Sequence, residues 1–196
     1  FRLHNSTGFA DIAVNYTFGS KPYPVVGDWA GAGFDTVGVL DQNNGQFSLR
    51  NSNTPGSADE QFVLGNPNDL PLSGLWTTGF THFGVGVFRP SNGLIYLKNN
   101  LTTGFADYTM VMGIPGDQGL AGDWNGDGFD SPGVYRPSTQ QFFLTDQVCN
   151  CSVFGSYQFQ YGVAGDSPVI GDWIGQGHDG VGLFRQSNGF TYLRNN

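Results

Sequence analysis

The side chains best suited to binding a ligand are concentrated in the loop around Trp124. It reads Asp123-Trp-Asn-Gly-Asp-Gly-Phe-Asp130, with side-chain oxygens at positions one, three and five, a glycine at position six and another carboxylate at position eight. Calcium collects about six to eight oxygen ligands, and a glycine permits the sharp turn that brings them together. The spacing therefore predicts one Ca²⁺ site that uses Asp123, Asn125, Asp127 and Asp130.

Equivalent loops elsewhere in the chain keep only part of this pattern. The loop after Trp29 has Asp28 and Asp35 but alanines at the intermediate ligand positions, and the loop after Trp173 has Asp172 and Asp179 but Ile174 and Gln176 between them. In the loop after Trp76, Leu75 replaces the leading aspartate. An aspartate can also accept hydrogen bonds from the backbone of its own turn without any metal. We favour this second explanation for Asp28 and Asp172.

The elements that position these loops repeat along the chain. All four tryptophans end similar segments, and the spacings between Trp29, Trp76, Trp124 and Trp173 are 47, 48 and 49 residues. A period of about 40 to 50 residues indicates a repeat architecture. Residues 1–196 are therefore expected to form a single repeat domain whose units are anchored at the four tryptophans.

Each unit is expected to contain four short strands. Apolar side chains alternate with polar residues or glycines over short runs, and Asn-Gly turns at 43–45, 91–93 and 187–189 separate consecutive runs as hairpin connections. No long segment has apolar residues at helical spacing, and 31 glycines with 10 prolines would interrupt a helix. Four antiparallel strands in each unit of about 48 residues predict an all-β propeller in which the tryptophans pack between neighbouring blades.

The ends of the chain leave two propeller arrangements open. Residues 1–19 resemble the third and fourth strands of a unit, and residues 168–196 resemble the first three. The two ends could share one blade of a four-bladed ring, although one third strand would then be surplus. Alternatively, the four units belong to a larger ring or array. A surplus strand would offer an unpaired edge for another copy of the chain.

The segment from Gly122 to Val134 resembles the repeat of FG-GAP/VCBS-type β-propellers, a family that includes the integrin α-subunit head and several secreted adhesins and lectins. The resemblance covers the whole chain in repeat length and strand order, but this motif occurs only once. It implies calcium binding between the first two strands of a blade. Asp123, Asn125 and Asp127 match the family ligands, and Phe129 would offer a backbone carbonyl. At position nine, where the family has aspartate, this chain has Ser131, and Asp130 stands one place earlier.

Composition indicates an extracellular protein that binds neither nucleic acid nor membrane. Aromatic residues make up 15% of the chain and charged residues only 12%, so Asn, Gln, Ser, Thr and Gly must dominate the surface. The net charge is −8, with no basic stripe for a phosphate backbone, and no apolar stretch is long enough to span a membrane. The chain has no initiator methionine or signal peptide, which is expected of a mature or trimmed segment.

Covalent modification sites fit the same compartment. Four Asn-x-Ser/Thr sequons predict N-linked glycans in a eukaryotic host, at Asn5, Asn15, Asn100 and Asn150. Cys149 and Cys151 flank Asn150, and their spacing leaves free thiols, a small disulfide ring and an intermolecular link open.

No catalytic constellation emerges, so we expect a protein without enzymatic activity. His4, His82 and His178 occupy unrelated positions in their units, and no nucleophile and base can be paired. Two functions remain. The first is a structural or adhesive module that contacts other proteins or copies of itself. The second is a lectin for cell-surface glycans, whose repeated pockets between blades would use Arg89, Arg136 and Arg185. These arginines could equally bond backbone carbonyls between blades, and we favour that packing role.

Overall fold

The computed structural model, which describes residues 9–16 and 18–194, confirms an all-β protein. Fifteen strands and no helix occur in these residues. They form four antiparallel sheets, which we call the first to fourth blades. The first contains β1 (Pro22–Gly27), β2 (Thr36–Asp41), β3 (Gln46–Leu49) and β4 (Glu60–Val63); the second contains β5 (Leu70–Gly74), β6 (Gly84–Arg89), β7 (Leu94–Lys98) and β8 (Tyr108–Val111).

The other two blades repeat this order. The third contains β9 (Gln118–Gly122), β10 (Ser131–Arg136), β11 (Gln141–Leu144) and β12 (Tyr157–Gln160), and the fourth contains β13 (Asp166–Gly171), β14 (Gly180–Arg185) and β15 (Phe190–Arg194). The glycine that ends the first strand of each blade faces the residue that begins the second strand. The pairs are Gly27 with Thr36, Gly74 with Gly84, Gly122 with Ser131, and Gly171 with Gly180.

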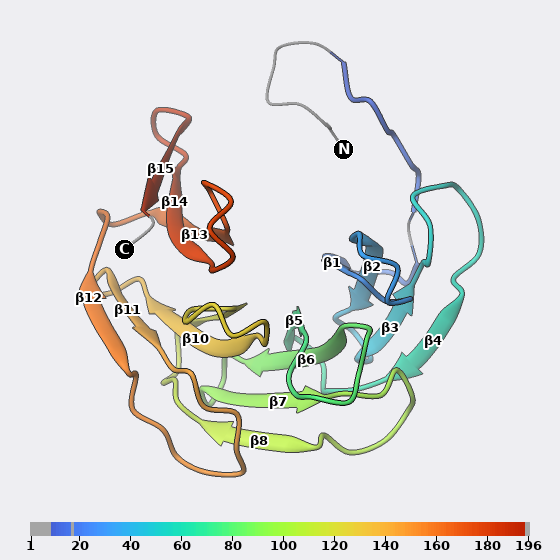
Figure 1. Cartoon of the computed structure of the whole chain (residues 1–196), viewed down its shortest axis with the longest axis horizontal. Coiled ribbons are helices and arrows are strands. Elements are labelled where there is room, and N and C mark those ends of the chain that lie inside the picture. The colour runs from blue at the N-terminus through green and yellow to red at the C-terminus, as the bar shows by residue number, and fades with distance from the viewer. Residues whose placement is uncertain (1–8, 17, 195–196) are drawn as a thin grey trace.

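The blades are set around a common centre with the first strand of each innermost, which is a four-bladed propeller arrangement (Figure 1). β1 lies beside β5, β5 beside β9, and β9 beside β13. The ring is open on one side, where the fourth and first blades face each other across a gap between their ribbons (Figure 1). The blade fold predicted from the tryptophan period is therefore confirmed.

The hydrophobic core consists of clusters that each join two neighbouring blades. Trp29, Leu40 and Phe47 of the first blade pack with Val85 and Val87 of the second. A second cluster joins the second and third blades around Trp76 and Phe88, and a third joins the third and fourth blades around Trp124 and Tyr135. Since alternate side chains of a strand point to opposite faces, each sheet can bury both faces between its neighbours.

The amino-terminal segment differs from the arrangement inferred from the repeat. The expected third strand near Phe1 lies outside the described residues. Residues 9–16 and 18–21, where the repeat places a fourth strand, form no strand. Tyr16 is instead close enough to Asp59 and Arg50 of the first blade to interact with their charges. An extended segment becomes a strand only when a sheet edge is available to pair with it, and the β15 edge belongs to the blade across the open side (Figure 1).

Candidate functional site

The loop between β9 and β10 is held together by the carboxylate of Asp123. Asp123 Oδ1 accepts hydrogen bonds from the Gly126 and Asp127 amides at 2.8 and 3.2 Å, and Oδ2 accepts one from Gly128 at 2.8 Å. Gly126 and Gly128 have φ angles of 77° and 85°, in the left-handed region that favours glycine. The carboxylate thus satisfies the backbone donors of a turn that this glycine spacing permits.

The same turn forms in the blades that lost the other predicted ligands. Asp28 accepts from the Ala32 and Gly33 amides at 2.7 and 2.6 Å, and Asp172 accepts from the Gln176 and Gly177 amides at 2.9 and 2.8 Å. These contacts provide the leading aspartate with a role that needs no metal, as expected for Asp28 and Asp172.

The remaining predicted calcium ligands make separate contacts. Asn125 Nδ2 donates to Asp127 Oδ2 at 3.0 Å, and the Phe129 amide donates to Asp127 Oδ1 at 2.9 Å. Asp130 reaches the second blade, where its carboxylate accepts the Leu75 amide at 2.7 Å. Across residues 9–16 and 18–194, no group of three or more His, Cys, Asp or Glu side chains is arranged to hold a metal ion. Calcium binding by this loop stays a prediction from the sequence.

The residue at the eighth loop position connects neighbouring blades. Asp130 exchanges backbone and side-chain hydrogen bonds with Leu75, and Asp179 does the same with Asp123. The pKa of Asp130 is raised to about 7, mainly by burial; the hydrogen bond from Leu75 lowers it, and the negative charges of Asp179 and Asp123 add to the rise. The pKa of Asp179 is also raised, mainly by burial. Sequence reasoning treated Asp130 as a metal ligand and missed this contact between blades.

The three arginines singled out from the sequence form one repeated ion pair. Each pairs through two hydrogen bonds with an aspartate at the start of the first strand of its blade or directly before it, and its guanidinium lies over an aromatic ring. The sets are Arg89 with Asp69 and Tyr96, Arg136 with Asp117 and Phe143, and Arg185 with Asp166 and Tyr192. The arginines therefore bond carboxylates within the blade, whereas the packing role favoured from the sequence used carbonyls between blades.

These carboxylates also close the turn in which they lie. Asp69 accepts the Asn66 amide at 2.8 Å, and Asp117 and Asp166 accept equivalent amides at 3.0 Å each. Hydrogen bonding to Arg185 lowers the pKa of Asp166, and hydrogen bonding to Asp69 raises that of Arg89. The ion pair thus anchors the connection between one blade and the next.

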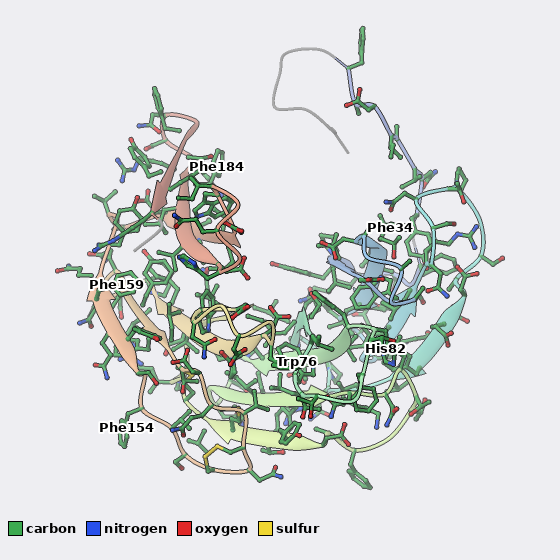
Figure 2. The ribbon with its side chains drawn as sticks, in the orientation of Figure 1. Phe34, Trp76, His82, Phe154, Phe159 and Phe184 are labelled. Carbon is green, nitrogen blue, oxygen red and sulfur yellow. A yellow bond between two sulfur atoms is a disulfide. The ribbon has the colours of Figure 1, made fainter. Side chains whose placement is uncertain are left out.

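Cavities lie beside two of these arginines and at a third place between blades. Arg89 and Tyr96 line a cavity of about 420 Å³ with Asn66 and Phe105, and Arg185 and Tyr192 line one of about 190 Å³ with Tyr161. A cavity of about 330 Å³ lies between the third and fourth blades and is lined by Trp124, Tyr157, Phe159, His178 and Arg194. Figure 2 shows Phe159 on the outer strand of the third blade. Sequence reasoning did not identify the third cavity, because its residues come from five separate segments.

A disulfide links Cys149 and Cys151 in the connection between β11 and β12. This connection runs along the outer edge of the second blade, where the Val111 amide donates to the Cys151 carbonyl and the Val153 amide to the Val111 carbonyl, both at 3.0 Å. Asn150 adds two contacts, since its side chain accepts the Thr109 amide and donates to the Asp107 carbonyl. The disulfide loop therefore ties the third blade to β8.

The predicted glycosylation sites have different surroundings. Asn100 is exposed. Asn150 is also exposed, although its amide makes the two contacts with the second blade. Asn15 lies in the described amino-terminal segment and has an interaction partner, whereas Asn5 lies outside the described residues.

Neither a membrane-spanning helix in the described residues nor a relative of known function was found. Within the described ranges, no helix is long and apolar enough to cross a membrane. Comparison with protein-family models, curated proteins and solved structures finds no match to this chain.

Proposed function

We propose that this chain is a non-catalytic, extracellular β-propeller module that contacts other proteins or further copies of itself. The observation that carries the proposal is a set of exposed phenylalanines on the outer connections. Phe105 and Phe154 lie between the third and fourth strands of successive blades and are 96% and 90% exposed. Phe9 is also 96% exposed, and like Phe105 it is the second residue of a Gly-Phe-Ala-Asp motif. Figure 2 shows Phe154 pointing away from the ring.

Exposed aromatic side chains favour an interaction surface. An aromatic ring in water buries no apolar area, whereas the same ring in a partner's pocket becomes a strong anchor. The two phenylalanines recur on successive blades, so a partner could engage them together and gain from multivalency. The disulfide, the predicted glycans and the low charge support an extracellular setting. We assign the propeller to the FG-GAP/VCBS type on its sequence motif, with Ca²⁺ as a ligand of the Asp123 loop.

The experiment removes these anchors without touching the core. The double variant Phe105→Ser, Phe154→Ser should lose most of the wild-type binding to extracellular proteins of the source organism, measured on immobilised protein with quantitative mass spectrometry. Val163→Ser is the matched control, because it removes an exposed apolar side chain from the connection between the third and fourth blades. Equal binding by wild type, control and double variant would contradict the proposal.

A second candidate is carbohydrate binding, favoured by the aromatic cavity that contains Trp124, Tyr157 and Phe159. Flat aromatic rings beside hydrogen-bonding groups suit a sugar ring. The cavities beside Arg89 and Arg185 are equivalent to each other in their blades and lie at a different place from the Trp124 cavity. A glycan array tests this function. A lectin would be favoured over a protein-binding module if Phe159→Ala abolishes glycan binding and Phe105→Ser, Phe154→Ser leaves it intact.

A further inference from the structure

One face of the fourth blade exposes side chains whose equivalents in the other blades are buried. Phe184 is 37% exposed, whereas Leu40, Phe88 and Tyr135 occupy the same strand position and are each 0% exposed. Leu193 is 51% exposed, against 0%, 0% and 5% for Leu49, Leu97 and Leu144. In the first three blades these positions belong to the clusters that pack against the following blade. The fourth blade therefore presents a complete docking face, which we call the trailing face.

The surroundings of the glycine two residues before each tryptophan also differ between the fourth blade and the other three. A Cβ at Gly27 would lie 3.2 Å from Phe83, one at Gly74 would lie 2.6 Å from Asp130, and one at Gly122 would lie 2.9 Å from Asp179. In each case the neighbour is the residue directly before the second strand of the following blade. The nearest atoms to a Cβ at Gly171 all belong to Trp173. Trp173 is half-buried, while the other three tryptophans are buried.

The backbone of the trailing face also lacks its usual partner. The carbonyl oxygens of Asp28, Leu75 and Asp123 each accept the amide of the residue directly before the second strand of the following blade, at 2.8, 2.9 and 2.7 Å. Leu75 and Asp123 also donate their own amides to that residue's carboxylate. Among the described residues, the backbone of Asp172 makes neither contact.

The first blade carries the complementary half, which we call the leading face. Its eighth loop residue is Asp35, whose carboxylate accepts no hydrogen bond from the described residues and is exposed. Val37 is half-buried, although its equivalents Val85, Pro132 and Val181 are buried against a preceding blade. Asp35 thus occupies the position of the carboxylates that accept the Leu75 and Asp123 amides, and the Asp172 amide has no such acceptor among the described residues.

We propose that the leading face of a second copy of this chain docks on the trailing face. In this head-to-tail contact Asp35 of the incoming copy accepts the Asp172 amide, and its first blade covers Trp173, Phe184 and Leu193. Such a contact repeats the three blade contacts already present. A contact between the two faces of one chain would instead have to close the open side of the ring by changing those three contacts (Figure 1). This inference deepens the proposed function by naming the partner of one surface.

The contact is heterologous, because its two sides are different surfaces. Copies that dock in this way either close into a ring or continue as a filament, according to the rotation between them. The asymmetry also provides a stringent test. A chain with a damaged trailing face keeps an intact leading face, and it can still join a chain with the opposite defect.

The test compares the wild type with two single-face variants by light scattering after gel filtration, at concentrations of about 1 to 100 µM. The trailing-face variant is Phe184→Glu, Leu193→Glu, and the leading-face variant is Asp35→Lys, Val37→Glu. The wild type should reach at least twice the single-chain mass, each variant alone should stay at the single-chain mass, and an equimolar mixture should recover the dimer. Phe154→Glu is the control and should associate like the wild type.

Folding of each variant is checked by circular dichroism, and Phe184→Ser with Asp35→Ala replace any variant that loses β structure. A wild type with the single-chain mass throughout would overturn the proposal. A mixture that fails to associate would also overturn it. So would a single-chain mass combined with a Trp173 ring that a quencher reaches in either single-face variant but not in the wild type, since the faces would then meet within one chain. If the Phe105→Ser, Phe154→Ser variant binds extracellular proteins as well as the wild type does while self-association is retained, only the protein-binding part of the proposed function is contradicted.

Discussion

Asp130 is the residue whose ionisation is most strongly coupled to the fold. Its pKa is about 7 in the folded protein against an ordinary value of 3.8, mainly because it is buried between two blades. The folded state therefore holds a proton that the unfolded state releases once the pH exceeds about 4. Stability from this group is full below that pH and is lost as the pH rises toward 7.

Replacing Asp130 by Asn should remove this pH dependence. The amide oxygen can still accept the Leu75 amide, but no charge is forced into the contact between blades. We expect the free energy of unfolding of the wild type to fall by roughly 2 to 4 kcal/mol from pH 4 to pH 7 relative to Asp130→Asn. Urea unfolding across this range measures the difference. Asp127→Asn is the control, because Asp127 is exposed in the same loop. Parallel curves for wild type and Asp130→Asn would show that the carboxylate is not coupled to folding.

Substitutions at Asp123 and Asp127 separate the turn from the predicted calcium site. Asp123 accepts three backbone amides, so Asp123→Ala should reduce stability by about 1 to 2 kcal/mol with calcium or with a chelator. Asp127→Ala removes a side chain that contacts only its own loop, and it should matter mainly when calcium binds. Calorimetric titration of wild type and Asp127→Ala with Ca²⁺ checks this expectation. The calcium prediction fails if the wild type releases no heat up to millimolar concentrations.

At the scale of the element, the arginine ion pair fixes the connection that enters each blade. Asp117 is buried, and removing Arg136 would leave its charge without a partner. We expect Arg136→Met to cost roughly 2 kcal/mol of stability in thermal or urea unfolding. Arg50→Met is the matched control, since the Arg50–Asp59 pair is more exposed and should contribute less than about 1 kcal/mol. Equal losses in the two variants would show that burial does not set the strength of the pair.

The disulfide loop should act on the second blade as well as on its own. With Cys149→Ser, Cys151→Ser, the connection between β11 and β12 gains conformational freedom, and its hydrogen bonds to β8 should open more often. Hydrogen exchange should then accelerate about tenfold or more at the Val111 and Val153 amides. The Phe47 amide in the first blade serves as an internal reference and should not change. Unaltered exchange at Val111 would mean that the loop stays docked without the disulfide.

Strand positions were accessible from the sequence because they depend on local signals. The tryptophan period and the Asn-Gly turns repeat in register, and the structure places strands where these signals fall. The partner of Arg136 was missed because Asp117 lies 19 residues away, directly before another strand, and no local pattern links the two. A signal did exist: in three blades an aspartate at the start of the first strand occurs together with an arginine at the end of the second, whereas the first blade has Pro22 and Asp41 at these positions. The role of Asp130 was missed because a loop motif carries no information about a neighbouring blade.

On the scale of the whole molecule, stability should be distributed unevenly around the open ring. A repeat protein is stabilised by the contacts of each unit with its neighbours, so a unit with a neighbour on one side only is the first to open. The second and third blades have neighbours on both sides, whereas the fourth contacts only the third among the described residues. Its trailing face also leaves Leu193 half exposed, so this side chain lacks part of the burial that stabilises Leu97 and Leu144.

Hydrogen exchange followed by mass spectrometry should therefore show an order of opening. In dilute protein, amides of β14 should exchange at least about tenfold faster than their equivalents in β6 and β10, because local opening of the fourth blade breaks only one contact between blades. Raising the protein concentration should slow exchange in β14 while leaving β10 unchanged, since a docked second copy would supply the missing neighbour. The trailing-face variant Phe184→Glu, Leu193→Glu is the control and should lose this concentration dependence. Uniform exchange across β6, β10 and β14 at every concentration would contradict the expected gradient, because the fourth blade would then be as well supported as the interior ones.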